Sequence, residues 1–392
     1  MAEAYIVSAA RTAGGRRKGA LREWHSADLG GAVLDEVVRR AGVDGALIDD
    51  VIMGCVTQGG EQSQQIGRSC VLAAELLPVS VPAVTIDRQC GSSQQALHFA
   101  AQAVKSGMMD MVIAAGVESM TRSPMGSPTA LYAKAGIGDG PWSRKILNRF
   151  GVETFSQFTG ADMIAEKHGL SREDLDRYAL ESHTRAAQAV RGGAFDDEIF
   201  EVVGVDADGA RIVHNVDEGI RYDATLDAIA AVEPILEGGK ITAASASQMC
   251  DGTSGILVAS AGAVERYGLS PLARIHSCTV TAGDPVLMLE EPIRATRKAL
   301  DRAGLSLNDI DLFEVNEAFA PIPLAWLKEL GADPEKTNVF GGAIALGHPL
   351  GATGTKLMTT LVHALRARGL RWGLQTMCEG GGVANVTIVE AM

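Results

Sequence analysis

One cysteine, Cys90, lies where an apolar run of strand length gives way to a helical pattern. The stretch VPAVTI precedes it, and small residues followed by an Ala-rich helical pattern come after it. Free cysteines are often small buried residues, and that interpretation stays open from this segment alone. A helix N-terminus, however, presents unpaired N–H groups and partial positive charge, which favour the reactive thiolate. Cys90 is therefore a candidate nucleophile.

Three C-terminal stretches hold further side chains that can do chemistry. Asn316 follows an apolar run in EVNEAFA, His348 lies in the glycine-rich GGAIALGHPLGATG, and Cys378 precedes three glycines in MCEGGG. Each has an ordinary structural alternative. Asn316 could cap a helix, His348 could be held by backbone groups, and Cys378 could be buried and inert.

A weak internal repeat would bring these stretches together. At an offset of 262 residues, the separation of Gly42 and Gly304, three pairs of segments align: 39–54 with 301–316, 89–107 with 351–369, and 111–119 with 373–381. Both copies alternate helical patterns with apolar runs of strand length, which predicts an α/β fold with covered sheets. If the copies pack about a pseudo-twofold axis, two thiols, an imidazole and an amide meet in a shared cleft.

The residues between the two copies are irregular. Scattered Pro, Gly and Ser at 121–160 are followed by a helical segment with Ser171 as its expected N-cap, then by an acidic, loop-rich stretch. Long loops in a compact fold usually carry function, so we expect this region to cover the site. The expected organisation is an N-terminal half (1–120), a loop domain (121–245), and a return strand with the C-terminal half (246–392).

Composition narrows the functional class. The chain has 392 residues, 46% hydrophobic and 21% charged, with a net charge of −13. This charge disfavours nucleic acid as a partner, because phosphate binding needs clustered Lys and Arg. The sequence shows no signal peptide, no run of membrane-helix length, no CxxC pair and no HExxH spacing. We therefore expect a cytoplasmic protein with reduced thiols and no metal site.

These stretches, in this order and spacing, resemble the thiolase family, in which acyl-CoA thioesters are cleaved or condensed. The RTAGG near the start also fits, so the resemblance covers essentially the whole chain. It implies a duplicated α/β fold with two βαβαβ-type halves in five layers, α-β-α-β-α, and a loop domain inserted over the site. It also implies a homodimer or homotetramer. The implied partners are small-molecule acyl-CoA substrates rather than nucleic acid or membrane, with CoA a substrate and no cofactor.

The resemblance also implies roles for the site residues. Cys90 would carry the acyl group as a thioester, and His348 would accept its proton. Cys378 would move the proton at the alpha carbon of acetyl-CoA, given surroundings that lower the pKa of its thiol. One oxyanion hole would use His348 and a water held by Asn316, and the other the N–H groups of Cys90 and Gly380.

The implied CoA contacts are Arg221 in DEGIR, Ser247 in TAASASQMCDG, and Met288 and Phe319 along the pantetheine tunnel. For each of these four, ordinary surface or core packing is the alternative. Phe340 stands where the family commonly has Asn before the glycine pair, and no role is assigned to it.

The sequence departs from the family members specialised for acetoacetyl-CoA. They usually carry His-Met and then Gly where this chain has Ser156, Gln157 and Phe158. CVTQGGEQS and QCGSSQQA instead resemble degradative actinobacterial thiolases, including steroid side-chain enzymes. We therefore expect a 3-ketoacyl-CoA thiolase of broad or medium-to-bulky acyl range, active in lipid or fatty acid degradation.

Three alternatives stay open. One is an acetyl-CoA C-acetyltransferase specific for acetoacetyl-CoA. A second, of another class, is a non-catalytic acyl-CoA or lipid-binding protein, although a carrier would not need all four site residues. The third is a decarboxylating ketoacyl synthase, which would normally use a Cys-His-His set rather than a second cysteine.

Overall fold

The computed structural model describes residues 3–392, and its strands form two matching sets. The N-terminal set is ordered β4-β3-β5-β8-β1, and the C-terminal set is ordered β10-β11-β12-β9. Their bounds are β1 Ala4–Arg11, β3 Asp50–Gly54, β4 Ala83–Ile86, β5 Met111–Ser119, β8 Cys250–Ser260, β9 Ala273–Ala282, β10 Leu312–Val315, β11 Trp372–Glu379 and β12 Val383–Ala391. The short β2 (Gly15–Arg16) pairs with β8.

The two sets repeat the same pairing pattern. In each, the first pair of equivalent strands is parallel (β3 with β5, β10 with β11) and the next is antiparallel (β5 with β8, β11 with β12). The sets join at one edge, where Tyr5 and Ile6 pair antiparallel with Arg274 and Ala273. The predicted duplication is therefore present, and a short strand pairing connects its two sheet layers.

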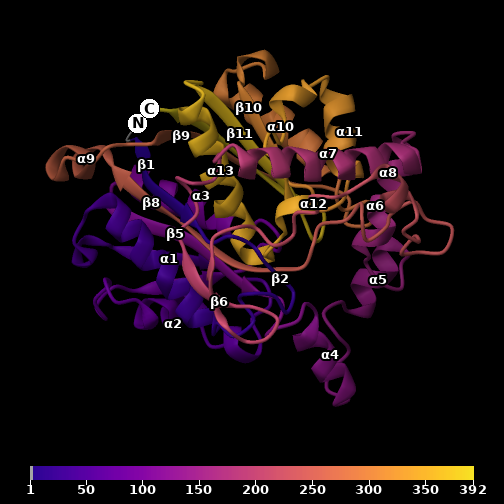
Figure 1. The fold of residues 1–392 in the computed structure, drawn as a ribbon, viewed down its shortest axis with the longest axis horizontal. Coiled ribbons are helices and arrows are strands. Elements are labelled where there is room, and N and C mark those ends of the chain that lie inside the picture. The colour runs from indigo at the N-terminus through magenta and orange to yellow at the C-terminus, as the bar shows by residue number, and fades with distance from the viewer. Residues whose placement is uncertain (1–2) are drawn as a thin grey trace.

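Helices cover both faces of each sheet layer, as the five-layer expectation requires. One apolar core lies between the N-terminal strands and α1 (Ser26–Ala41) with α2 (Ile66–Ala73). A central core surrounds α3 (Ser92–Lys105) and α13 (Thr353–Ala367), which lie side by side between the two sets of strands (Figure 1). A third core packs α10 (Glu291–Ala303) and α11 (Pro321–Leu330) on the C-terminal strands. The α-β-α-β-α order is confirmed.

The repeat extends to the helix ends. Gly42 follows α1 with φ 67°, and Gly304 follows α10 with φ 66°, both in the left-handed conformation that glycine adopts without strain. A 3₁₀ turn comes next in each half, at Gly45–Leu47 and at Leu307–Asp309. These turns are 262 residues apart, the offset seen in the sequence.

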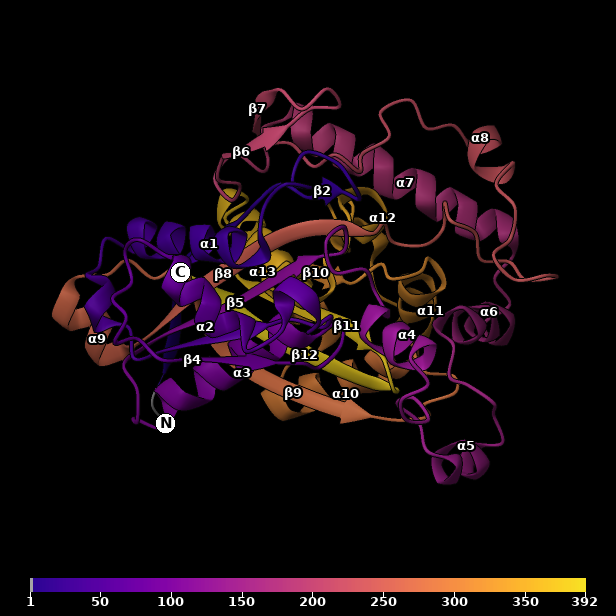
Figure 2. The same ribbon diagram turned by 90° about the horizontal axis from the view of Figure 1, so that it is seen from below.

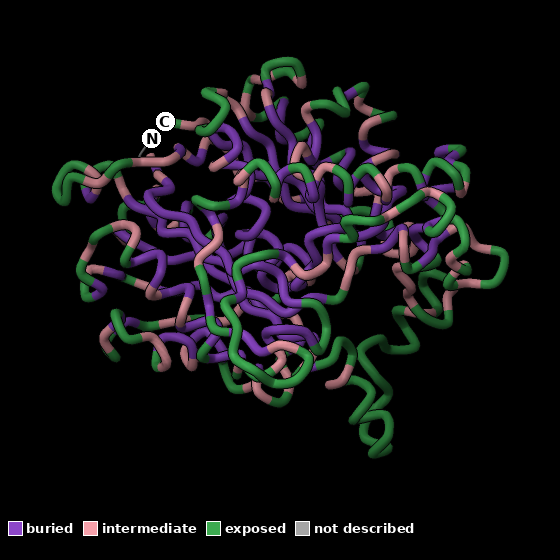
Figure 3. Tube along the Cα trace, viewed as in Figure 1, coloured by how far each residue is buried: buried purple, intermediate pink, exposed green. Residues whose placement is uncertain are grey.

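The inserted region contains most of the remaining elements. They are α4 (Ser127–Lys134), α5 (Arg144–Phe150), α6 (Gln157–Lys167), α7 (Arg172–Arg191), the hairpin β6 (Val202–Val205) and β7 (Arg211–His214), and α8 (Leu226–Ala230). Ser171 caps α7 in a capping box with Asp174, as predicted. In Figure 2, α4, α5 and α6 gather at one end of strands β11 and β12. Figure 3 shows that α4 projects outward and is exposed along its length.

Two short helices complete the fold. They are α9 (Ala261–Tyr267) and α12 (Ala343–Leu346). His348 follows the end of α12 by two residues.

Candidate active site

Cys90 lies in a tight turn between β4 and α3. Gln89 before it has φ 49°, a left-handed conformation that is uncommon for a residue other than glycine. The hydroxyl of Ser92 accepts the N–H of Arg88 at 2.9 Å and donates to the carbonyl of Gln89 at 2.6 Å. The Gly91 N–H donates to the Arg88 carbonyl at 3.1 Å. These bonds fix the cysteine at the start of α3, where the sequence predicts it.

The surroundings of Cys90 do not favour the thiolate in the resting protein. Burial raises the pKa of the thiol to about 12, and the carboxyl group of Glu379 acts in the same direction. The cysteine's own backbone N–H opposes this, but burial is the larger effect. The N–H at the start of the helix favours the thiolate, as expected, but burial outweighs it and the thiol stays protonated near pH 7. A base must take the proton as the sulfur reacts.

His348 has the protonation state that such a base needs. Its Nδ1 lies 2.6 Å from the hydroxyl of Thr353, and that hydroxyl donates its own hydrogen to the carbonyl of Pro349 at 3.0 Å. With its hydrogen on the Pro349 carbonyl, the hydroxyl accepts at Nδ1, and the amide nitrogen of Asn316 beside Nε2 is a donor. Both neighbours fit a ring with its proton on Nδ1 and its lone pair on Nε2. Burial lowers the pKa of His348 to about 3, and the nearby Lys356 adds to this shift. The imidazole is neutral near pH 7.

Asn316 follows β10 and lies next to His348. Its Nδ2 is 3.5 Å from Nε2 of the histidine, and its backbone N–H donates to the Thr376 carbonyl at 3.0 Å. Within residues 3–392 its buried Oδ1 has no hydrogen-bond partner. An unpaired buried acceptor of this kind suits a bound water, which is the role predicted for Asn316.

Cys378 lies near the end of β11 and is fully buried. Burial raises the pKa of its thiol well above the ordinary value, and Cys90 and Glu379 add to the effect. The electrostatic effect of Cys90 on Cys378 places the two thiols in the same part of the fold. The sequence set a condition for this role, that the surroundings lower the pKa of the thiol, and the shift runs the other way because desolvation dominates.

A cavity of about 640 Å³ opens onto Cys90. Gly380 and Met288 lie on its wall with the cysteine, while His348, Asn316 and Cys378 lie outside its lining. Much of the opposite wall comes from the inserted region and is largely apolar: Met125, Gly126, Pro128, Thr129, Pro141, Trp142, Ile146, Phe150, Phe155 and Gln157. Residues of the inserted region therefore line the same cavity as Cys90.

The glycines after Cys378 allow close approach of three backbone segments. A Cβ at Gly380 would lie 3.0 Å from Oε1 of the Gln89 side chain, next to Cys90 in sequence. A Cβ at Gly382, whose φ is 77°, would lie 2.6 Å from the Asp284 carbonyl. Larger residues there would push the turn between β11 and β12 away from Cys90.

The predicted CoA contacts lie in different environments. Met288 is buried with φ 57° and lines the cavity. Phe319 is buried and packs edge-to-face on Phe158, with 5.5 Å between ring centroids. Ser247 is half-buried and donates its N–H to the Ala318 carbonyl at 2.9 Å. Arg221 is exposed and lies outside the cavity lining. All four assignments stay predictions.

The residues that depart from the family pattern are also placed. Ser156 caps α6 by accepting the Thr159 N–H at 3.2 Å, and Gln157 lines the cavity. Phe340 packs edge-to-face on Phe195 at 5.7 Å, with the guanidinium of Arg368 4.9 Å from its ring centroid. Phe340 therefore has a packing role outside the cavity.

Sequence reasoning missed the residues that support the site. The buried carboxylate of Glu118 accepts N–H groups of Val56, Thr57 and Gly351 at 2.9, 3.0 and 2.9 Å, tying the strand end after β3 to the His348 segment. Thr353, which fixes the histidine tautomer, was also missed. The signal for Glu118 was an acidic residue inside the apolar run of β5.

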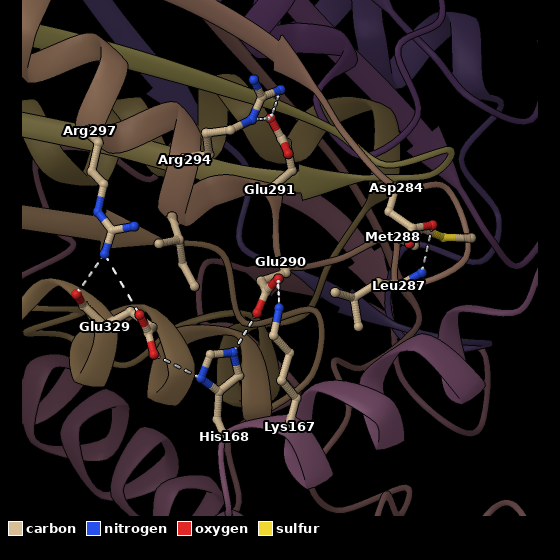
Figure 4. Close-up of a pocket in the computed structure, with 11 residues that line it drawn as sticks. Lys167, His168, Asp284, Leu287, Met288, Glu290, Glu291, Arg294, Arg297 and Glu329 are labelled. Carbon is tan, nitrogen blue, oxygen red and sulfur yellow. Dashed lines mark hydrogen bonds and ion pairs between the residues drawn. The ribbon is translucent and has the colours of Figure 1, made fainter.

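A second cavity, of about 320 Å³, shares Met288 with the first. Figure 4 shows its ion pairs: Lys167 and His168 contact Glu290 at 2.7 and 2.5 Å, and His168 also lies 3.3 Å from Glu329. Glu290 and Glu329 are the acids of this cavity that Lys167 and His168 contact. These ion pairs hold the segment that carries Met288 against the end of α6.

Comparison with known proteins agrees with this geometry. Residues 4–262 match the family described as "Thiolase, N-terminal domain", and residues 269–391 match "Thiolase, C-terminal domain". A steroid 3-ketoacyl-CoA thiolase (FadA6) of Mycobacterium tuberculosis is 50% identical, covering 100% of this chain and 95% of the relative. Proteins named 3-ketoacyl-CoA thiolase from Pectobacterium carotovorum and Salmonella typhimurium are 41% and 40% identical, each covering 100% of both chains. Among residues 3–392, the helices are too short or too polar to cross a membrane.

Proposed function

The chain belongs to the thiolase family and is an acyltransferase, and we propose that it cleaves 3-ketoacyl-CoA with CoA through an acyl group carried on Cys90. The observation that carries this proposal is the 640 Å³ cavity, which places Cys90 and Gly380 on one wall and the apolar inserted region on the other. An acyl chain needs an apolar wall, and a thioester oxyanion needs backbone donors close to the sulfur.

The first half-reaction forms the acyl-enzyme. The thiol of Cys90 gives its proton to Nε2 of His348 as the sulfur attacks the 3-keto carbon of the substrate. The bond between C2 and C3 breaks, and the acyl group remains on Cys90 as a thioester. The leaving acetyl-CoA enolate takes a proton from Cys378. Support comes from the neutral imidazole of His348 and the proximity of the two thiols.

The second half-reaction returns the enzyme to its starting state. The thiol of CoA gives its proton to the Cys378 thiolate and attacks the thioester carbonyl. Cys90 leaves as a thiolate and takes back the proton held by His348. Both thiols and the imidazole are then neutral again, which is the state that burial favours for all three groups.

The substrate that we propose carries a medium-to-bulky acyl group. Trp142, Phe150 and Phe155 form an aromatic cluster on the cavity wall, with ring centroids 5.4 and 5.9 Å apart for the two pairs that share Phe155. Apolar contact with such rings rewards acyl groups longer than the acetyl group. The steroid substrate in the name of the relative that is 50% identical points the same way.

A thiolysis assay with free CoA across a panel of 3-ketoacyl-CoAs, from acetoacetyl to long-chain and steroid-type, tests this proposal. We expect kcat/KM to be highest for the larger acyl groups. A maximum at acetoacetyl-CoA would instead assign the chain as an acetyl-CoA C-acetyltransferase. Binding without turnover of any substrate would support a non-catalytic acyl-CoA carrier.

We further propose that the protein works in the cytoplasm as a homodimer or homotetramer. Its six cysteines are free, which fits a reducing compartment. The edge strand β4 and helix α3 expose Val84 and Phe99 at 39% and 40%, apolar surface that a second copy would cover. Light scattering should give two or four times the 41.0 kDa chain mass, and a monomer mass would contradict this.

A further inference from the structure

A lysine that the proposed reaction does not use, Lys356, lies directly behind the turn that carries His348. It belongs to the second turn of α13 and is 4% exposed. Its Nζ donates to the carbonyls of Leu346 and Gly347 at 2.6 and 3.0 Å. These two residues immediately precede His348, so the ammonium group holds the end of α12 and the start of the histidine turn.

The charge of Lys356 is balanced by a buried cluster from distant parts of the chain. Arg11 of β1 contacts Glu198 at 2.5 Å and Asp217 at 2.9 Å, and all three side chains are fully buried. Burial lowers the pKa of Lys356 and Arg11 lowers it further, whereas Asp217, Cys250 and Glu198 raise it and so favour the charged ammonium group. The cluster therefore has two cations and two anions.

A buried lysine is costly to keep unless it does something that a neutral residue cannot. The internal repeat gives a direct comparison, because the equivalent position in α3, 262 residues earlier, is the uncharged Gln94. That amide donates to the hydroxyl of Thr387 at 2.8 Å and to the carbonyl of Gln375 at 3.4 Å, both on the C-terminal strands. The fold therefore accommodates glutamine at this position of the helix. The positive charge of Lys356 occurs only in the half of the repeat that carries His348.

We propose that Lys356 is a positioning residue for His348: it fixes the Leu346–Gly347 turn and keeps a positive charge beside the imidazole. This inference rests on the proposed role of His348 as the base. Burial lowers the pKa of His348 most, and Lys356 is the charged group that lowers it further. A base that takes the Cys90 proton must be uncharged beforehand, so a cation behind it keeps the ring ready to act.

Three variants separate charge from packing. Lys356→Gln removes the charge, keeps one donor and introduces the residue found at the equivalent position of α3. Lys356→Arg keeps the charge, and Lys356→Met removes both charge and donors. The matched control is Lys336→Gln, because Lys336 also donates to a backbone carbonyl, that of Ile310 at 3.1 Å, but outside the site. Thermal unfolding identifies any variant that fails to fold.

The deciding measurement is the ¹⁵N NMR titration of the imidazole nitrogens in histidine-labelled protein, with His348 assigned from the His348→Asn spectrum. We expect wild type, Lys356→Arg and Lys336→Gln to keep a neutral Nδ1–H ring down to pH 5. In Lys356→Gln the ring should protonate with a midpoint at least about one pH unit higher than in wild type. Equal midpoints for Lys356→Gln and wild type, in titrations carried below pH 4, would overturn the inference, even if the enzyme has no thiolase activity.

The pH dependence of kcat/KM with acetoacetyl-CoA and CoA gives the second readout. Below the midpoint of His348 in Lys356→Gln, kcat/KM should fall about tenfold per pH unit, because the neutral fraction of the ring falls by that factor. At pH 8 to 9 the variant should approach wild type, and Lys356→Arg should restore the wild-type profile. A loss by the same factor at every pH would show that Lys356 supports only the fold.

Discussion

Nδ1 of His348 lies 2.6 Å from the hydroxyl of Thr353, and the direction of this hydrogen bond determines which ring nitrogen can act as a base. Thr353 gives its own hydrogen to the Pro349 carbonyl, so the histidine donates from Nδ1 and presents the lone pair of Nε2. The amide nitrogen of Asn316 lies 3.5 Å from Nε2, so Nε2 is the ring nitrogen next to the other candidate site residue. The tautomer is therefore set by a residue five positions after the histidine, at the start of α13.

Replacing Thr353 with valine should impair the base without preventing folding. The variant removes the partner of Nδ1, so the ring loses its preferred tautomer and orientation. We expect kcat/KM for thiolysis to fall about 10- to 100-fold, corresponding to the loss of one buried hydrogen bond. Thr359→Val is the matched control, because Thr359 bonds only to the Thr355 carbonyl of its own helix at 2.8 Å. Equal losses in both variants would contradict the positioning role.

The high pKa of Cys90 predicts how alkylation depends on pH. Because burial raises the pKa of this thiol to about 12, the thiolate fraction is small at pH 7 and rises about tenfold per pH unit up to that value. The rate of carbamidomethylation of Cys90 by iodoacetamide, followed by peptide mass spectrometry, should therefore keep rising from pH 7 to 10. A plateau below pH 8.5 would show that the free protein holds a thiolate.

Cys378→Ala should divide the reaction into its two parts. Transfer of an acetyl group from acetyl-CoA to Cys90 needs no proton movement at the alpha carbon, and a CoA thiolate can leave without a proton from Cys378, so the variant should still be acetylated, although more slowly. Cleavage and condensation both need that proton, and their rates should fall by about 10³-fold or more. Intact-mass measurement reports the first step and the thiolysis assay the second. Failure of acetylation would assign Cys378 a structural role instead.

The aromatic wall of the cavity should determine acyl preference. Trp142→Ala removes apolar contact worth about 1–2 kcal/mol, so kcat/KM for long-chain 3-ketoacyl-CoAs should fall about tenfold. Acetoacetyl-CoA is too short to reach this wall and should react as before. Tyr132→Ala is the control, because Tyr132 is an exposed aromatic residue of α4 outside the cavity lining. A loss that is independent of chain length would argue against an acyl-binding wall.

The sequence predicts the duplicated architecture because the repeat leaves local signals. Gly42 and Gly304 both adopt positive φ at the ends of equivalent helices. Glycine is the usual residue in that conformation, so the two helix ends can be recognised in the sequence as glycines 262 residues apart. The sequence also identifies the four candidate site residues, because each lies in a short, unusual motif next to a strand or helix end. They are Cys90, His348, Cys378 and Asn316. In the structure Asn316 lies beside His348, and Cys90 acts electrostatically on Cys378.

The rest depends on distances between residues far apart in the chain. Lys356 and Asp217 are 139 positions apart in sequence, and nothing local predicts that both are buried near the histidine turn. The pKa of Cys90 could not be predicted from its helix position alone, because desolvation outweighs the local N–H groups once the inserted region and Glu379 surround it. The cavity wall also escaped prediction, since 121–160 has no periodic pattern that would show which side chains point inward.

Trapping the acyl group on Cys90 tests the central claim most directly. Wild type and Cys90→Ser are each mixed with a 3-ketoacyl-CoA that has a medium-length acyl chain, quenched in acid before CoA is added, and analysed as proteolytic peptides by mass spectrometry. We predict that the wild-type peptide containing Cys90 gains the mass of the acyl group left after loss of acetyl-CoA, and that Cys90→Ser gains none. Acylation of another residue, or turnover of Cys90→Ser at the wild-type rate, would contradict the account.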